Sequence, residues 1–166
     1  MNMHRLALVL APTPILALLC AAGLISGSAV AQPSPNGVKP IAPPAGMPDP
    51  VGAWGLGSRA GDFVFLAGVQ GYEQDNSLSP DPETRIRRAF LNIKKLAESQ
   101  GAALHDCVRV TIYLSDLHRY AAIVDRVQAE VWGSPPYPPR TMMEVQRLFQ
   151  DDIIEIDTMF YAPQKK

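Results

Sequence analysis

Arg140 and Glu155 are the two residues of this chain whose types and spacing favour chemistry. Arg140 follows the stiff pair Pro138-Pro139 and enters a strand pattern, and Glu155 lies fifteen residues later in a second strand pattern. A guanidinium holds a carboxylate through two parallel hydrogen bonds, and a carboxylate orients and deprotonates water. The pair would therefore suit hydrolysis of a small carboxylated substrate. Two such charges also fit a purely structural salt bridge.

The neighbours of Glu155 favour an environment that is partly closed to water. Ile153, Ile154 and Ile156 surround it in the sequence, and a carboxylate among isoleucines needs a polar partner. We expect Arg140 to be that partner.

Two segments carry the three- and four-residue spacing of amphipathic helices. The first begins after Asp81, a suitable N-cap with Pro82 at the first helical position, and ends at Gly101. The second begins after Asp116 and ends at Gly133. Each has one apolar stripe, so each helix is expected to bury one side.

Short apolar or alternating runs predict five strands, at residues 54–58, 63–67, 108–114, 141–145 and 153–160. The order strand, strand, helix, strand, helix, strand, strand predicts an α+β fold with both helices on one face of the sheet. No third helix is predicted for the other face. We therefore expect another copy of the chain to cover it in a closed homo-oligomer.

The N-terminal part has the composition of a targeting segment and a linker. In residues 1–31, His4 and Arg5 precede an apolar run, and the run ends in an alanine-rich site that fits signal-peptide cleavage. Residues 32–50 hold seven prolines and predict a flexible lead-in without backbone pairing. Residues 51–166 would then form the domain. We expect a periplasmic or secreted protein without stable membrane association after cleavage.

Charge and cysteine content exclude several classes of protein. The net charge is −1 and there is no basic run, so nucleic acid is not an expected partner. Cys107 is the one cysteine after the predicted cleavage site, so no intrachain disulfide can form, and it fits a small buried residue. His105 and His118 lack the spacing of metal ligands, so no metal site is expected.

Several motifs in the same order resemble the RidA (YjgF) family of enamine and imine deaminases. They are G-A-W-G-L-G at 52–57, G-D-F-V-F-L-A-G at 61–68, A-F-L-N-I at 89–93, G-A-A-L-H-D-C-V-R-V-T-I-Y-L-S-D-L at 101–117, P-P-R-T-M-M-E-V at 138–145 and I-I-E-I-D at 153–157. The resemblance covers roughly residues 51–162, and the spacing from Arg140 to Glu155 is typical of the family.

The resemblance implies a chorismate-mutase-like (RidA-like) homotrimer with substrate sites in clefts between subunits. It also implies hydrolysis of 2-imino or enamine carboxylates to 2-keto acids and ammonia, without a metal or organic cofactor. On the matching positions, Arg140 would bind the substrate carboxylate and backbone groups of Met142 would hold the imine nitrogen. Glu155 would position the attacking water.

Four candidate pocket residues depart from the family pattern. Trp54 stands where a tyrosine is usual, Ala67 where a serine is common, Met142 in place of a cysteine and Asp125 in place of an asparagine. These residues predict a less polar pocket of different shape, and they leave the substrate open. Two alternatives are a non-catalytic trimer that binds small carboxylates through Arg140 and a holdase that uses exposed apolar surface.

Overall fold

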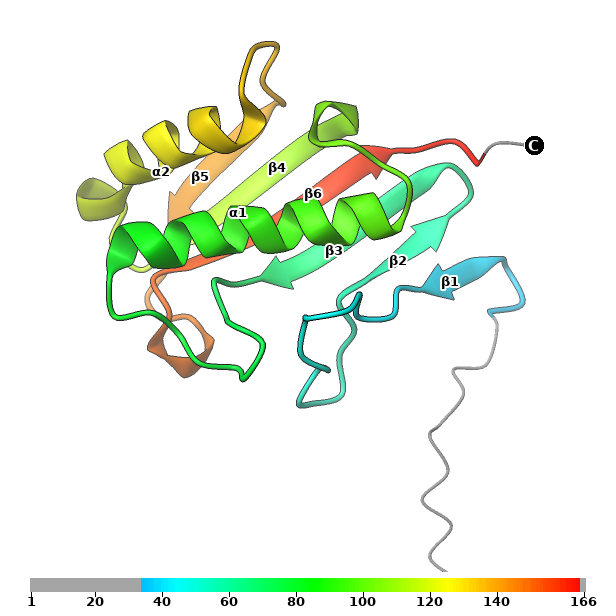
Figure 1. Ribbon diagram of the computed structural model, residues 1–166, viewed down its shortest axis with the longest axis horizontal. Coiled ribbons are helices and arrows are strands. Elements are labelled where there is room, and N and C mark those ends of the chain that lie inside the picture. The colour runs from blue at the N-terminus through cyan, green and yellow to red at the C-terminus, as the bar shows by residue number, and fades with distance from the viewer. Residues whose placement is uncertain (1–33, 165–166) are drawn as a thin grey trace, which may run out of the picture. The chain divides into compact units, whose positions relative to one another are not determined.

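A computed structural model describes residues 34–164 (Figure 1). The predicted signal peptide, residues 1–31, lies outside the described residues, and its cleavage stays a prediction. Within the described range, no helix has the length and apolar content needed to cross a membrane.

One six-stranded mixed sheet organises the domain, in the order β1-β2-β3-β6-β4-β5. The strands are β1 (Val38–Pro40), β2 (Gly57–Ala60), β3 (Phe63–Val69), β4 (Cys107–Leu114), β5 (Arg140–Glu144) and β6 (Ile154–Tyr161). Neighbouring strands are antiparallel except β4 and β5, which run parallel because α2 connects them. The C-terminal strand β6 therefore lies between β3 and β4, near the centre of the sheet.

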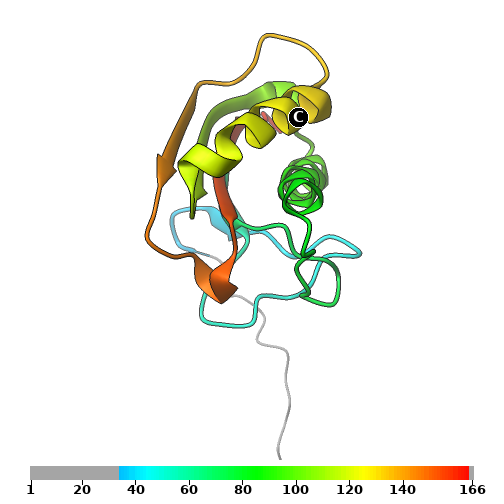
Figure 2. The ribbon, with the colours of Figure 1, turned by 90° about the vertical axis from the view of Figure 1, so that its left-hand side faces the viewer.

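The two predicted helices are present with the predicted caps. Helix α1 (Pro82–Ser99) begins where the Asp81 side chain accepts from the Thr84 N–H at 2.8 Å. Helix α2 (Leu117–Trp132) begins at Asp116, which caps the Arg119 N–H in the same way, and ends at Gly133. Both helices lie on one face of the sheet, as the edge-on view shows (Figure 2).

The core fills the space between the helices and that face. Its largest fully buried side chains come from both layers, namely Phe90, Ile86, Ile93 and Leu96 of α1 and Ile112, Leu114, Ile154, Ile156 and Phe160 of the strands. Cys107 is buried, as expected, and burial raises the pKa of its thiol to about 11. The α+β arrangement predicted from the sequence is confirmed.

The proline-rich lead-in is more ordered than its composition predicts. Strand β1 pairs with β2 in residues that were expected to pair with nothing, and Ile41 and Met47 are buried in the core. The prediction failed because β1 is an edge strand, where a proline needs no partner on its outer side. The predicted strand at 54–58 is also shifted, since β2 begins at Gly57 and Trp54 lies in the preceding loop.

The second face of the sheet has no cover within the described chain. Along β3, Val64 and Leu66 are buried under the helices, whereas Phe63 and Phe65 on the other side are 40% and 37% exposed. Tyr161 of β6 adds its ring to this face, with its centroid 5.4 Å from that of Phe63. An apolar face of this kind supports the predicted self-association, which stays a prediction.

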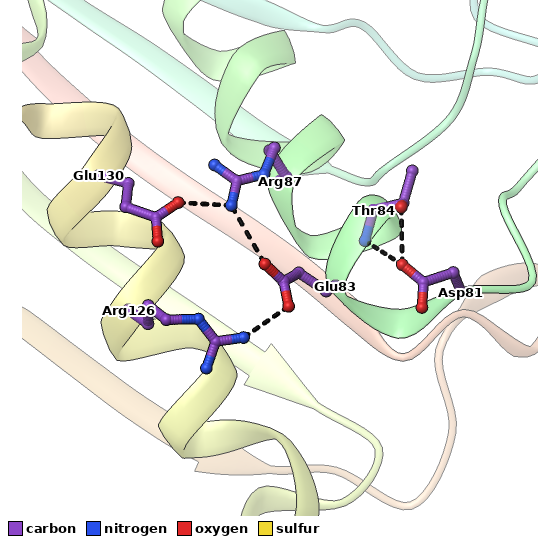
Figure 3. A network of polar contacts seen from close by, with 6 residues as sticks. All are labelled: Asp81, Glu83, Thr84, Arg87, Arg126 and Glu130. Carbon is purple, nitrogen blue, oxygen red and sulfur yellow. Dashed lines mark hydrogen bonds and ion pairs between the residues drawn. The ribbon is translucent and has the colours of Figure 1, made fainter.

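Ion pairs join the outer sides of α1 and α2 (Figure 3). Glu83 accepts from both Arg87 and Arg126, and Arg87 also donates to Glu130. These side chains are between about one third and one half exposed, so solvent screens them and each pair adds little stability. Glu83 and Arg87 lie on the side of α1 that remains exposed when its apolar stripe is buried.

Arg85 is another basic residue of α1, but its side chain is mostly buried. Its guanidinium donates to Asp152 at 3.3 Å, with side-chain exposures of 14% and 0% for the two residues. Asp152 follows Asp151 in a polar segment typical of a turn, yet it is buried just before β6. Burial raises the pKa of the Asp152 carboxyl, against the opposing effect of Arg85.

Replacing Arg85 should test how much this pair contributes. We expect Arg85→Met to lower the free energy of unfolding at pH 7 by about 3–5 kcal/mol, because a buried charge loses its partner. Asp152 titrates above its ordinary range, so the charge disappears as the pH falls and the loss should shrink toward pH 5.

Urea denaturation of both proteins at the two pH values measures this effect. The matched control is Arg88→Met, whose exposed pair with Glu73 should contribute under about 1 kcal/mol at either pH. Equal losses in the two variants would contradict a special role for Arg85.

Candidate active site

A cavity of about 470 Å³ opens on the uncovered face, where β3 ends and β6 begins. Its walls come from the lead-in, from these two strands and from the loop before β6. The lining residues are Pro48, Asp49, Val51, Trp54, Gly55, Ala67, Gly68, Gln70, Tyr72, Asn76, Phe149, Gln150, Glu155 and Asp157. The cavity therefore contains three of the predicted site residues, Trp54, Ala67 and Glu155.

The alternation of β6 directs Glu155 into this cavity. Ile154 and Ile156 point into the core with no exposed surface, so Glu155 between them must face the other way. Its carboxylate Oε2 accepts a hydrogen bond of 3.1 Å from the Gln70 Nε2. The side chain is thus partly desolvated, as the flanking isoleucines predicted, but its partner is an amide.

The surroundings of Glu155 favour its protonated form. Burial raises the pKa of the Glu155 carboxyl first, and the nearby charges of Asp157 and Asp152 raise it further. The hydrogen bond from Gln70 acts in the opposite direction. A carboxyl group whose pKa is raised is a stronger base once it has ionised, which suits proton transfer from water.

Asp157 is held in a fixed orientation beside Glu155. Its Oδ1 accepts from the Gly68 N–H at 2.7 Å, and its Oδ2 accepts from the Tyr113 hydroxyl at 3.2 Å. Gly68 has a φ of +59°, and a Cβ at this position would lie 3.0 Å from the Glu155 Oε1. A glycine is needed here because of the left-handed backbone and because of the carboxylate beside it.

Arg140 does not contact Glu155 within one chain, so that predicted pairing is wrong. Its guanidinium donates instead to Gln128 and Asp125 of α2, at 2.6 Å each. Arg140 is therefore on the helix side of the sheet, whereas Glu155 faces the open side. The strand register separates them further. Strand β4 lies between β5 and β6, and Tyr113 of β4 pairs with Met143 of β5 on one side and with Glu155 on the other.

Arg140 borders a second cavity, of about 420 Å³, with Asp125, Gln128, Ala129, Tyr137 and Pro138. Its side chain is 24% exposed and Asp125 is 59% exposed, so the pair is open to an incoming anion. Met142, two residues along β5, is half-buried against the core on the same side. Of the predicted site residues, Trp54, Ala67 and Glu155 thus line the first cavity and Arg140 and Asp125 the second, whereas Met142 lines neither.

The cavity at Glu155 has an acidic character. Asp49, Glu155 and Asp157 line it, and no lysine, arginine or histidine from residues 34–164 does. Within the same residues, no three potential ligand side chains are grouped to hold a metal ion. A cationic ligand would fit this cavity from one chain alone, but the carboxylate of a substrate would need a cation from elsewhere.

Sequence reasoning missed Gln70, Asp157 and the lead-in residue Asp49. The period of two along β6 was sufficient to predict that Asp157 shares a face with Glu155. No local signal indicates Gln70 or Asp49, because each reaches the cavity only through the tertiary fold.

The sequence pattern of the family described as Endoribonuclease L-PSP matches residues 45–161. The chain belongs to this family, the RidA (YjgF) family. The match includes every residue that lines either cavity, and strand β1 precedes it. The family's proteins are similar to this chain in fold as well as in sequence.

Two curated relatives illustrate the range of names in the RidA family. A RutC family protein of Pyrococcus abyssi is 34% identical over 116 residues, which are 69% of this chain and 90% of the relative. A protein of the mite Dermatophagoides farinae named 2-iminobutanoate/2-iminopropanoate deaminase is 30% identical over 114 residues, or 68% and 88% of the two chains.

Solved structures of RidA relatives share the fold. A probable translation initiation inhibitor from Rhodopseudomonas palustris is 44% identical with a TM-score of 0.74, over 76% of this chain and 99% of that chain. A RidA from the Antarctic bacterium Psychrobacter is 27% identical with a TM-score of 0.66, over 70% and 94%. The predicted RidA-like fold is therefore confirmed.

The space beside Gly68 can be tested with a matched pair of variants. Gly68→Ala and Gly61→Ala both place a Cβ on left-handed backbone, at φ values of +59° and +57°, but only Gly68 has a neighbour. We expect each variant to lose about 1–2 kcal/mol of unfolding free energy from backbone strain.

Only Gly68→Ala should also change the titration of Glu155, because its methyl group would press on the carboxylate and exclude water from it. Carbon-detected NMR of the glutamate carboxyl groups measures that titration. An unchanged Glu155 titration in Gly68→Ala would show that the carboxylate lies elsewhere in solution.

Proposed function

We propose that the protein hydrolyses reactive 2-imino or enamine carboxylates to 2-keto acids and ammonia. The observation that carries this proposal is the half-buried Glu155, with a raised pKa, in an acidic cavity. A protonated imine is a cation, so it is attracted to this cavity. The mite relative named as an iminobutanoate deaminase supports the same reaction class.

The reaction needs one base and correct orientation. The ionised Glu155 takes a proton from water as the water oxygen forms a bond to the carbon of the C=N⁺ group. This step gives a carbinolamine and a protonated Glu155. Glu155 then returns the proton to the amine nitrogen and is ionised again. The C–N bond breaks, the hydroxyl oxygen becomes the carbonyl oxygen of the keto acid, and Glu155 takes the hydroxyl proton. That proton leaves with ammonia as ammonium, and Glu155 is again a carboxylate. The imine carbon is already electrophilic, so positioning supplies much of the acceleration.

The carboxylate of the substrate requires a cation, and we assign it to Arg140 of a neighbouring copy. Asp125 and Gln128 hold the guanidinium in a fixed plane at the border of its own cavity. In a closed ring of three copies, the Arg140 cavity of one subunit would join the Glu155 cavity of the next. The apolar open face, with Phe63 and Phe65, is the surface that such a ring would bury.

The residues of the Glu155 cavity favour a substrate with an apolar side chain. Trp54, Val51 and Phe149 occupy its walls, and Ala67 adds no polar group. We assign backbone groups of Met142 the role of binding the imine nitrogen across the same subunit contact. We further propose that residues 1–31 direct the protein out of the cytoplasm.

The description of the family as an endoribonuclease does not suit this cavity. Asp49, Glu155 and Asp157 would repel a polyanion, and the net charge of the chain is −1. RNA cleavage is therefore not the proposed function.

Mixed oligomers test both the reaction and the source of the arginine. We expect Arg140→Ala and Glu155→Gln each to abolish release of ammonia from a freshly generated imino acid. When the two variants are co-expressed, random assembly gives about a quarter of the sites one intact Arg140 and one intact Glu155 from neighbouring copies. The mixture should therefore recover about a quarter of wild-type activity, measured in a coupled assay with imino acids of different side-chain size.

The outcomes separate the proposed function from its alternatives. No recovery in a co-purified mixture would mean that the site does not combine residues of two copies. A wild-type protein that binds carboxylates through Arg140 without turnover would be a binding protein. Suppression of client aggregation that persists in Arg140→Ala would indicate a holdase.

The pH dependence of kcat/KM should report Glu155. The ionised carboxylate is the active form, so kcat/KM falls as the pH drops through its raised pKa. Asp157→Asn removes one of the charges that raise this pKa, so the acid limb, which is this fall of kcat/KM at low pH, should move to lower pH. The ratio of the variant to the wild type at each pH cancels the titration of the substrate itself. A limb that stays in place would contradict the assignment of Glu155 as the base.

A further inference from the structure

Gln70 occupies a buried position that none of the proposed chemical steps uses. It follows β3 directly and is 6% exposed, although it is a polar residue beside an open cavity. Its Nε2 donates to the Glu155 Oε2 at 3.1 Å and to the Phe149 carbonyl oxygen at 3.2 Å. Both partners are acceptors, so the amide must present its nitrogen, and not its oxygen, to them.

The backbone of Gln70 is itself fixed from the helix layer. Asn92 of α1 is buried, and its Nδ2 donates to the carbonyl oxygens of Gln70 and Tyr72, at 3.0 Å each. The amide of Gln70 therefore reaches the cavity from a rigid support, and it loses little further freedom when it binds a carboxylate.

The second acceptor of Gln70 belongs to the loop that forms one wall of the cavity. Phe149 and Gln150 of this loop line the cavity, and the Phe149 carbonyl also accepts from the Asp152 N–H at 3.2 Å. Gln150 and Asp151 have φ values of +57° and +53°, which are unfavourable for residues with side chains. Such a backbone needs external contacts to hold it, and Gln70 supplies one of them.

We propose that Gln70 is the positioning residue of this site: its single amide group orients the Glu155 carboxylate and ties the Phe149 loop to it. One Oε2 lone pair is thereby occupied, and the Glu155 Oε1, which lies beside Gly68, is left to receive the proton of the attacking water. The inference rests on the proposed function for its kinetic effect. The geometry of Gln70 can be tested without any turnover.

The charged groups around Glu155 determine the expected sign of the pH effect. Asp157 on the same strand and Asp49 of the lead-in line the cavity with it, and Asp152 lies before β6 in a pair with Arg85. The Tyr113 hydroxyl of β4 donates to Asp157, and the buried Tyr72 also lines the cavity. None of these groups opposes the rise in the pKa of Glu155 as Gln70 does by donating a hydrogen bond to its carboxylate. Removing Gln70 must therefore raise the pKa of Glu155 further.

Two variants of Gln70 give an ordered set of outcomes. Gln70→Met keeps the length of the side chain and removes the donor, and Gln70→Glu puts a second carboxylate in its place. We expect kcat to fall about tenfold or more in Gln70→Met with KM little changed, because a hydrogen bond to a charged group is lost while Arg140 is untouched. The acid limb of kcat/KM should move to higher pH in Gln70→Met and further still in Gln70→Glu.

The control variant is Gln74→Met, the same substitution at an exposed position four residues along the chain, which should change neither kcat nor the pH limb. A purely structural role for Gln70 would lower the melting temperature and leave the pH limb where it is in the wild type. That result would overturn the proposal.

The wild-type protein provides a measurement that does not depend on how the variants fold. With ¹⁵N labelling, the side-chain amide protons of Gln70 should shift with pH in step with the Glu155 carboxyl carbon. Amide protons that do not follow Glu155 would overturn the assignment of Gln70, whatever the activity. The wild-type protein could also show no imine hydrolysis while its Gln70 amide follows Glu155. That result would contradict the proposed function and support the hydrogen bond from Gln70 to Glu155.

Discussion

The alternation of β6 is the constraint that links the stability of this domain to its chemistry. Ile154, Ile156 and Phe160 must point into the core, and this requirement turns Glu155 and Asp157 toward the open face. A shift of one residue in register would bury both carboxylates under the helices. The position of Glu155, the proposed base, is therefore as well determined as the position of the core, because both depend on the same strand pairing with β3 and β4.

The same constraint explains why Arg140 and Glu155 were predicted to meet and do not. Their types, their spacing and the strand character around them were all correctly identified from the sequence. The pattern of a strand does not predict which face an edge-strand residue occupies when most of the strand's residues are exposed, as in β5. Contacts with Asp125 and Gln128 of α2 decide that question, and these contacts lie twelve or more residues away in the chain.

Features set by short-range chemistry were predictable, and those set by long-range contacts were not. The caps at Asp81 and Asp116, the end of α2 at Gly133 and the α+β layering follow from local spacing and propensity. Strand β1 forms because it pairs with the edge of the sheet at β2, and composition alone does not predict that pairing. The local sequence of Asp152 is typical of a turn, and its ion pair with Arg85 of α1, at 3.3 Å, forms only in the tertiary fold. Gln70 likewise gains its role from Asn92 and Glu155, which are distant in sequence.

The charge distribution gives a physical reason for the proposed site between copies. Among residues 34–164, three carboxylates and no lysine, arginine or histidine line the Glu155 cavity, so this cavity favours a cationic group and disfavours the carboxylate of the same substrate. If Arg140 lay beside Glu155 in the same chain, the two groups would neutralise each other in a salt bridge. The guanidinium would also lower the pKa of Glu155, and the proposed role as a base depends on a raised pKa. Because Asp125 holds the arginine on the helix side, Glu155 retains its raised pKa. In the proposed assembly, a subunit contact would bring the two charges to opposite ends of one substrate. The proposed assembly would therefore allow one cavity to accept a molecule that is both a cation and an anion.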